Sequence, residues 1–532
     1  MVDDATPDEL PSTAVATAVA TRRVAWCAAV LAAALTVALT RDGVLLGLDS
    51  PTYLWTARWM SSDPTRLVHL PADTALSIRG SFPPLYPMVL AVAGWMGDDL
   101  VAGRFLGVLL AAVGAALLAR LVARQTSPAV GLVAVALVFA SRSCALLLFG
   151  FLMSDGLHVV LGVAAISVLV PTLRDSCDRV PLRIAGAFAC AAAALGTRFV
   201  GIGLVGAVAL IVAVLPRGVR HPRVVAVGGA VAAVTPMAIW QAAGGDGVGI
   251  AGFRPGWYPP LSAPLRAGDS LVAAFAPRQL LDALGHGGVR AVGLVLLVAA
   301  MIWTAGVLRS ASRAGSAEPV RVTAVLLVVG WSHLATVIAS RAFVDPFIEA
   351  EGRQTLLWLI CLIAAVVIDV HRRFAPRGAA HPVRRTQAWA AARAVTVALL
   401  IAGSVLLARS VEDPGASWWN LGEERPSRVA AVVPEGWDLP VVYTNREDVL
   451  YLQAHRRTKA LPLEHLRNAV DADPSFRSRV QAMGDAVRAG RADVVVFTDD
   501  PYWSVPIDVL NELTGLRVGR READGVVLVA PS

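Results

Sequence analysis

Two acidic side chains lie where this sequence could place chemistry at a membrane edge. Asp49 stands in the first long polar loop, and Asp155 begins the apolar segment 154–171. A carboxylate held at such an edge can remove a proton from a hydroxyl group. Each also has a structural interpretation, because Asp49 or Ser50 could cap one helix, and Ser154 with Asp155 could cap another. A lipid-facing Asp155 would cost about 1–3 kcal/mol, so we expect it to face the protein interior or a wet cavity.

A histidine follows the second acid at helical spacing. Asp155 and His158 would share one helix face, which suits two ligands of a divalent metal such as Mg or Mn. A histidine beside a carboxylate is also common as hydrogen-bonded packing, so no metal is required. The sequence does not fix the positions of the residues that could complete a ligand shell, which are His69, His333, Glu349 and Glu351.

Three arginines stand at the outer ends of apolar segments, at Arg104, Arg198 and Arg353. A guanidinium group stays charged and binds phosphate through two parallel hydrogen bonds, which a lysine does less well. An arginine at a helix end can also reach the lipid headgroups and act only as an anchor. Phosphate binding and anchoring therefore both stay open for these three residues.

The composition defines what surrounds these residues. Of 532 residues, 16% are charged and 56% hydrophobic, and the net charge is +7. Ordinary soluble domains are about 25% charged, so the composition excludes an ordinary cytosolic enzyme and indicates a polytopic membrane protein. The arginines are spread between apolar runs and do not gather on one helix, which argues against nucleic acid as a partner. The five cysteines show no metal or disulfide spacing.

The apolar runs predict an all-α membrane bundle of about eleven transmembrane helices. Residues 182–216 could form one long helix or a hairpin hinged near Arg198. The hairpin keeps the short arginine-rich loops on one side, so we prefer it. The predicted runs are 24–41, 100–119, 128–149, 154–171, 182–197, 199–216, 223–243, 290–308, 322–340, 354–371 and 394–409.

The composition, rich in arginine, alanine and valine, suggests a bacterial protein and hence a plasma-membrane location. The charge pattern predicts a cytoplasmic N-terminus and an extracytoplasmic C-terminal domain. We expect residues 1–21 to be a disordered cytoplasmic segment and residues 22–410 to be the transmembrane domain. The last part, residues 411–532, should be a small extracytoplasmic α/β domain. Its expected strands are 441–444 and 493–498, and its expected helices are 446–454, 474–489 and 506–514.

Two long outer loops are expected, at about residues 42–99 and 244–289. In the second, the apolar and polar residues of 269–284 alternate in a way that favours an interfacial helix, with Trp257 and Tyr258 as an aromatic anchor. Such a helix could cover a lipid entrance, or the segment could be a connecting loop that rests on headgroups.

The membrane part resembles the GT-C superfamily of membrane glycosyltransferases, the group of the protein O-mannosyltransferases and aminoarabinose transferases. The first loop, LDSPTYLWTARWM, and the following FPPLYP carry the most specific likeness. FLMSDGLHVVL, LGTRFVGIGL and EGRQTLLWLI resemble the family's later acidic and arginine-containing elements. The resemblance covers about residues 24 to 375.

The resemblance implies transfer of one sugar from a polyprenyl-phosphate donor to an acceptor at the outer face, with inversion. Asp49 would then be the catalytic base, and Asp155 a second acidic site for acceptor or metal. Arg104, Arg198 and Arg353 would bind the donor phosphate. Mannose or arabinose would be plausible sugars, and the acceptor could be a glycan, a glycolipid or a secreted protein.

Two other function classes fit a polytopic chain of this kind. A polyprenyl-lipid transporter or flippase would also use arginines for lipid phosphate, but such proteins place paired polar residues near the midplane, often in repeated halves. This sequence shows no such repeat, and its carboxylates gather at the outer edge. A non-catalytic assembly factor on the same scaffold is the third alternative.

Overall fold

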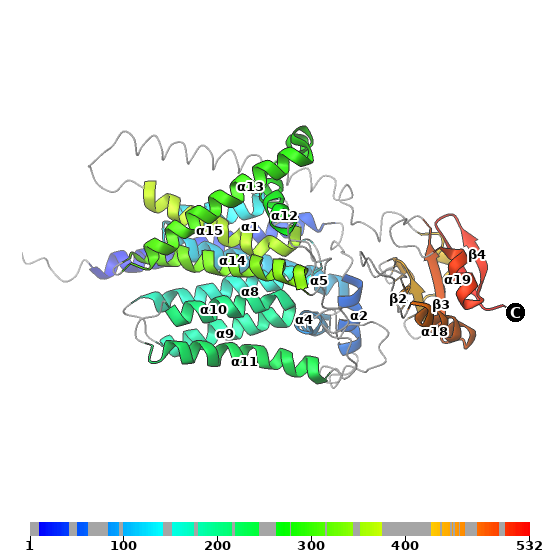
Figure 1. Cartoon of the computed structure of the whole chain (residues 1–532). Coiled ribbons are helices and arrows are strands. Elements are labelled where there is room, and N and C mark those ends of the chain that lie inside the picture. Colours follow the sequence, from blue (N-terminus) through cyan, green and yellow to red (C-terminus); the bar gives the residue numbers. More distant parts are fainter. Residues whose placement is uncertain are drawn as a thin grey trace, which may run out of the picture. The chain divides into compact units, whose positions relative to one another are not determined.

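The computed structural model describes the protein as a helical bundle and a small mixed sheet (Figure 1). The chain divides into two compact units, residues 1–44, 82–86 and 100–412, and residues 45–81, 87–99 and 413–532. The residues that the structure describes are 10–41, 50–61, 83–94, 99–141, 150, 152–174, 179–214, 219–243, 262–276, 278–313, 316–343, 352–374, 427–436, 439–446, 449–450, 453–456, 458–462, 476–498 and 506–531.

The first unit consists of helices. Three short 3-10 segments adjoin these helices: η3 (Val170–Leu173), η4 (Phe199–Gly201) and η6 (Gly352–Thr355). The helices are α1 (Leu10–Leu39), α5 (Asp99–Ala123), α6 (Pro128–Ala140), α8 (Ser154–Leu169), α9 (Val180–Thr197), α10 (Ile202–Val214), α11 (Pro222–Ala243), α12 (Ser262–Phe275), α13 (Arg278–Ala311), α14 (Glu318–Phe343) and α15 (Leu356–Phe374).

Several of these helices have the length and composition of membrane spans. Within the described residues, seven helices are long and apolar enough to cross a membrane, and three shorter apolar helices accompany them. Each predicted apolar run before residue 372 falls on a helix, although the run 128–149 is described as helix only to Ala140. The last run, 394–409, lies outside the described residues. The protein is therefore a multi-pass membrane protein, and the count of about eleven helices stays a prediction.

The N-terminal segment differs from our expectation. We expected residues 1–21 to be disordered, but α1 begins at Leu10 and includes residues 10–21. After Pro11, this stretch is rich in alanine and valine and has no glycine or further proline, so the helix extends beyond the apolar run that predicted it. Residues 1–9 lie outside the described part of the chain.

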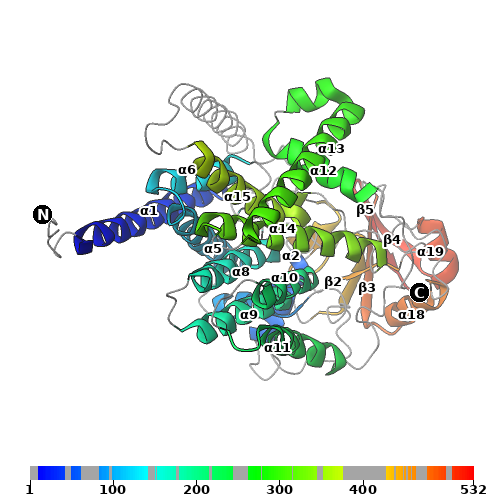
Figure 2. The ribbon, with the colours of Figure 1, turned by 60° about the vertical axis from the view of Figure 1, so that its left-hand side comes forward.

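The segment 182–216 forms two helices, as the charge pattern predicted. Helix α9 ends at Thr197, and Arg198 has extended backbone angles, φ −152° and ψ 135°. The Gly201 amide donates a hydrogen bond to the Arg198 carbonyl at 2.8 Å, which closes the turn before α10. A Cβ at Gly201 would lie 2.5 Å from the backbone nitrogen of Leu195, so only glycine fits there. Helices α9 and α10 then pack against each other as a hairpin (Figure 2).

The second long loop contains two helices where we predicted one. The interfacial helix expected over 269–284 is divided, because α12 ends at Phe275 and α13 begins at Arg278. Helix α13 also kinks at Gly285, which has φ 61°. The backbones of α12 and α13 lie very close to each other at Gly268 and Gly293. A Cβ on Gly268 would lie 2.7 Å from the Gly293 carbonyl carbon, so the two helices can pair this closely because glycine has no side chain. Small residues permit this close contact between membrane helices.

Polar contacts mark two opposite ends of the bundle. At one end, Glu318 accepts hydrogen bonds from Arg174 at 2.9 Å and from Gln125 at 3.1 Å. These residues belong to loops that the charge pattern assigned to one side of the membrane. We call this the Glu318 end. The other end, where α8 begins and α9 finishes, contains Asp155, and we call it the Asp155 end.

The second unit includes α2 (Ser50–Ser61), the later part of α4 (Leu85–Gly94) and a C-terminal five-stranded sheet. The strand order is β2-β1-β3-β5-β4; β1 pairs in parallel with β2 and β3, and β5 pairs antiparallel with β3 and β4. The elements here are η8 (Ala430–Val432), β1 (Val441–Thr444), β2 (Thr458–Ala460), α18 (Phe476–Arg488), β3 (Ala492–Phe497), α19 (Ile507–Thr514), β4 (Arg517–Glu522) and β5 (Gly525–Val529).

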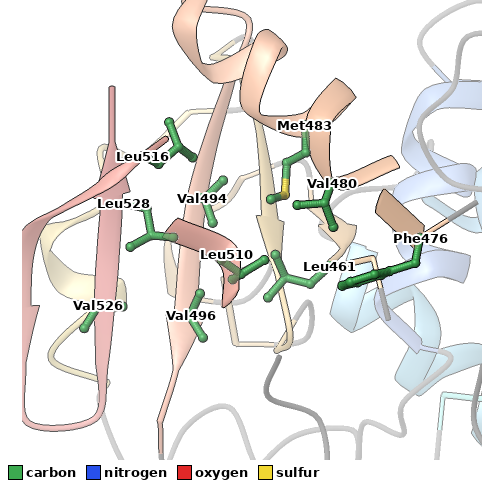
Figure 3. Packing of buried hydrophobic residues seen from close by; sticks show 10 residues of the cluster. All are labelled: Leu461, Phe476, Val480, Met483, Val494, Val496, Leu510, Leu516, Val526 and Leu528. Atoms are coloured by element: carbon green, nitrogen blue, oxygen red, sulfur yellow. The ribbon is translucent and has the colours of Figure 1, made fainter. Parts of the chain in front are cut away.

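Alternation along β3 gives this sheet two apolar faces. Val494 and Val496 pack with Val480 of α18 and Leu510 of α19, as Figure 3 shows. Val495 and Phe497 point to the other face and pack with a second cluster. The prediction of a helical membrane bundle with a small C-terminal α/β domain is confirmed. Strands β2, β4 and β5 were not predicted.

Candidate functional site

Asp155 lies at the start of α8, in the first turn of the helix. Met153 is the N-cap and makes no side-chain capping bond, so Asp155 is not the cap that one interpretation of the sequence proposed. The Asp155 side chain is only 3% exposed, and its Oδ1 atom accepts a hydrogen bond from Arg198 Nη1 at 2.5 Å. A carboxylate in the first turn is also favoured by the helix dipole. Asp155 therefore faces the protein interior, as its energetic cost in lipid predicted.

Arg198 lies in the turn between α9 and α10 and joins three elements. Its Nη1 contacts Asp155 of α8, and its Nη2 donates to Gln354 Oε1 of η6 at 2.7 Å. The side chain is 14% exposed. Two acceptors fix the plane of the guanidinium group, and the exposed remainder stays available to an anion.

Two histidines lie beside this pair. The rings of His158 on α8 and His333 on α14 have centroids 5.3 Å apart. His158 Nδ1 donates to the Ala194 carbonyl at 3.2 Å, and His333 Nε2 donates to the Gln354 carbonyl at 2.9 Å. Because a carbonyl only accepts, these two nitrogens carry protons.

The cluster of Asp155, His158, Arg198, His333 and Gln354 has spare polar atoms. Among the described residues, Asp155 Oδ2, His158 Nε2 and His333 Nδ1 are buried without a hydrogen-bond partner. Such atoms are uncommon in folded proteins and mark places where a water, an ion or a ligand is expected. The arrangement can orient a cation toward a phosphate and accept protons from a bound group.

The proposed metal ligands do not form a metal centre by themselves. Asp155 and His158 come from the expected helix face, but Oδ1 of the carboxylate is bound to Arg198 and Nδ1 of the imidazole to a carbonyl. Within the described ranges, no group of three His, Cys, Asp or Glu side chains could hold a metal ion. His69, Glu349 and Glu351 lie outside those ranges. Among the described residues of the cluster, Asp155 Oδ2, His158 Nε2 and His333 Nδ1 remain to contact a divalent ion.

The other predicted residues are placed in part. Arg104 on α5 donates from Nε to Thr40 Oγ1 at 3.1 Å and from Nη2 to the Val37 carbonyl at 3.3 Å, both on α1. It thus ties α5 to the end of α1 and is not brought to Arg198 by any described contact. The backbone of Arg353 belongs to η6, next to Gln354, but its side chain lies outside what is described. Asp49 also lies outside the described residues.

Sequence reasoning missed Gln354, and it named His333 only as a possible metal ligand whose position it could not fix. Gln354 directly follows Arg353, and its signal was only a polar residue beside an arginine at a helix start. His333 was too isolated in sequence to place, because it lies in the middle of an apolar run whose rotation depends on packing. Spacing within α8 found Asp155 and His158, since residues three apart share a helix face.

The fold and this cluster define a multi-pass membrane protein with a buried carboxylate, guanidinium and imidazole cluster at one end of its bundle. No family model and no curated protein matches the chain. Among solved structures, ArnT from Cupriavidus metallidurans bound to undecaprenyl phosphate is similar at 13% identity and TM-score 0.45, covering 98% of this chain and 99% of that one.

A second solved structure is the archaeal oligosaccharyltransferase AglB from Archaeoglobus fulgidus, in complex with an inhibitory peptide and a dolichol-phosphate. It is 13% identical with TM-score 0.46, and the match covers 89% of this chain and 69% of that one. ArnT from Cupriavidus metallidurans in the apo state matches with 13% identity, 98% and 100% coverage and TM-score 0.45. At such low identity and TM-score, these likenesses do not assign a function to this chain.

Proposed function

We propose that this protein is a membrane glycosyltransferase that moves a sugar from a polyprenyl-phosphate donor to an extracytoplasmic acceptor, with inversion. The observation that carries the proposal is the buried contact of Asp155 and Arg198, which is fixed by Gln354 at one end of a membrane bundle. The resemblance of the first loop and of the Asp155 and Arg198 segments to the GT-C superfamily supports the same reaction. The membrane is the bacterial plasma membrane, with the Asp155 end at its outer face.

The reaction is a single displacement at the anomeric carbon. Asp49 removes the proton of an acceptor hydroxyl as its oxygen forms a bond to that carbon. The bond between the anomeric carbon and the phosphate oxygen breaks, and polyprenyl phosphate leaves with the electron pair. A positioned general base contributes about 10²- to 10⁴-fold to the rate of such a step.

Arg198 stabilises the charge that develops on the leaving phosphate. Its guanidinium is already oriented by Asp155 and Gln354, so little reorganisation is needed when the donor binds. Arg353, which belongs to η6, also stabilises the charge on the leaving phosphate. Arg104, whose guanidinium contacts α1, contributes to the donor site through the position of α5.

The remaining partners follow from the same assignment. The sugar is mannose or arabinose. The acceptor is a glycan, a glycolipid or a secreted protein, and the C-terminal α/β domain positions this acceptor. A divalent ion, Mg or Mn, would contact Asp155 and His158 and assist in holding the phosphate. Removing divalent ions with a chelator and restoring Mg or Mn tests this ion, because transfer that survives chelation excludes it.

The test uses membranes containing the full chain and radiolabelled polyprenyl-phosphate mannose or arabinose. Asp49→Asn should lower transfer by about 10²- to 10⁴-fold because the general base is lost. Asp42→Asn is the matched control, since it removes a carboxylate from the same loop, and its transfer should equal that of the wild type. Unchanged transfer in Asp49→Asn would contradict the assignment of the base.

A second readout separates the alternative functions. If no labelled product forms with either sugar, while the protein moves the labelled lipid between leaflets, the protein is a flippase and the proposal is wrong. If it neither transfers sugar nor moves lipid, the assembly-factor alternative stands. Product formed by the wild type and by Asp42→Asn, but lost in Asp49→Asn, supports the glycosyltransferase.

A further inference from the structure

The bundle has a groove that the proposed reaction does not use, at its Glu318 end. Segments of α1 and α5, with the ends of η3 and the start of α9, line a cavity of about 1260 Å³. One part of the lining is apolar and comes from α1 and α5. The other part is basic and contains Arg22, Arg120, Arg124, Arg174 and Arg183.

Most of these guanidinium groups have no side-chain partner among the residues that the structure describes. Arg174 is paired with Glu318 at 2.9 Å. For the other four, the described part of the chain supplies no side-chain hydrogen bond or ion pair, and the Nε atom of Arg183 is buried without a partner. Arg198, by contrast, is held by two acceptors within the protein, Asp155 and Gln354. The groove therefore holds cationic groups that can accept an anion from outside the chain.

Charge crowding in the groove is visible at Arg124. Burial lowers the pKa of its guanidinium, and repulsion from Arg120, Arg174 and Arg183 lowers the pKa further, while Glu318 raises it in part. The group still stays charged near neutral pH, because arginine starts from a very high pKa. Even when Asp175 and Asp178 of the adjoining loop, which lie outside the described residues, are counted against them, the arginines remain in excess.

The apolar part of the groove is exposed at the surface of the bundle. Trp26 on α1 is 67% exposed, and Leu109 and Val113 on α5 are 47% and 40% exposed. Val113 lies two turns before Arg120, which is about 10 Å along the helix axis. Apolar side chains at this depth lie beside acyl chains when the arginines are level with the phosphates.

We propose that this groove binds one anionic phospholipid, with its phosphate among the arginines and an acyl chain along α1 and α5. Basic pockets between membrane helices suit anionic headgroups on the cytoplasmic side. The positive-inside pattern puts the Glu318 end in the inner leaflet. This lipid is distinct from the sugar donor, since the groove is at the opposite end of the bundle from Asp155.

The test measures lipid binding by the purified full chain in detergent, with native mass spectrometry. The probes are phosphatidylglycerol, phosphatidylcholine, polyprenyl phosphate and inorganic phosphate. The double variant R120Q/R124Q should bind phosphatidylglycerol about 25-fold more weakly than the wild type, at about fivefold per arginine. R309Q/R313Q is the matched control, because it removes two exposed arginines at the end of α13, outside the groove. Its affinity should stay unchanged.

A charge-conserving variant separates binding from folding. R120K/R124K should keep most of the affinity for phosphatidylglycerol over phosphatidylcholine, because the charge remains at the same place. Equal binding of phosphatidylglycerol and phosphatidylcholine by the wild type would overturn the proposal. So would an equal loss in R309Q/R313Q, or binding of polyprenyl phosphate or inorganic phosphate in preference to phosphatidylglycerol.

Discussion

The contact between Asp155 and Arg198 should be costly to break from either side, but by unequal amounts. Arg198→Met removes the cation and leaves a carboxylate that is 3% exposed. Asp155→Asn removes the negative charge but keeps an oxygen that can accept from Arg198. In that variant, Arg198 also keeps its hydrogen bond to Gln354, and its side chain stays 14% exposed to solvent.

The magnitudes follow from these surroundings. Removal of one partner of a buried ion pair costs about 3–5 kcal/mol, because the other charge stays buried and unpaired. We expect Arg198→Met to fall in this range, since Asp155 Oδ2 already has no partner among the described residues. Asp155→Asn should cost less, about 1–2 kcal/mol, because a hydrogen bond to a charged donor survives. The double variant should cost less than the sum of the singles by about 1–3 kcal/mol.

The free energy of unfolding is measured by equilibrium titration of the full chain in mixed detergent micelles. The pair of Arg520 and Glu522 in the C-terminal sheet is the control; its arginine is 59% exposed, so Arg520→Met should cost less than about 1 kcal/mol. The reasoning is refuted if Asp155→Asn costs more than Arg198→Met. Strict additivity of the two changes would also refute it, because it would mean that the two side chains do not interact.

Two further predictions concern the hairpin and the C-terminal domain. Gly201→Ala should destabilise the protein by about 1–3 kcal/mol, because a Cβ there meets the Leu195 backbone, whereas Gly206→Ala, with open space at its Cβ, should be neutral; thermal unfolding of both variants checks this. For Asp524, burial raises the pKa, but hydrogen bonds from Ser427 and from the Arg428 and Val429 amides outweigh it and lower the pKa below 3.8. Because the folded pKa is the lower one, this stabilisation is complete above the unfolded pKa and is lost as pH falls through the folded value. Hydrogen exchange of β5 between pH 2 and 5, roughly the range in which aspartate titrates, should show this loss in the wild type and not in Asp524→Asn.

The membrane helices could be predicted from the sequence because their signal is local. A run of apolar residues long enough to span a bilayer marks a helix wherever it packs. The hairpin at Arg198 could also be predicted, because the arginine-rich loops would otherwise fall on both sides of the membrane. The start of α1 and the break between α12 and α13 could not be predicted. Helix ends depend on caps, kinks and neighbouring residues, and the periodicity of apolar residues gives no information on these.

The C-terminal sheet was only half predicted, for a related reason. Strand β3 is a mostly buried apolar run that contributes to both faces of the sheet, and β1 is a short strand in which alternate residues are buried. Strand β4 has the sequence RVGRRE and lies at the sheet edge, so it lacks an apolar run. Its place comes from the turn at Asp524, where the carboxylate joins β5 to the segment before η8. Such a contact spans about a hundred residues and leaves no local pattern.

Arginine has two different tasks in this protein, and the neighbours of each guanidinium distinguish them. Arg104 and Arg198 are held by acceptors from other helices, which fixes the orientation of each guanidinium group. Arg120 and Arg124 have no such partner in the described part of the chain, which suits an anchor that needs only charge at the right depth. In the sequence, all four are arginines at the ends of apolar runs, and the positive-inside rule assigns them to two sides of the membrane but says nothing about their roles. Their division into oriented and unpaired groups arises only when packing brings Asp155, Gln354 and Thr40 to one pair and no described acceptor to the other.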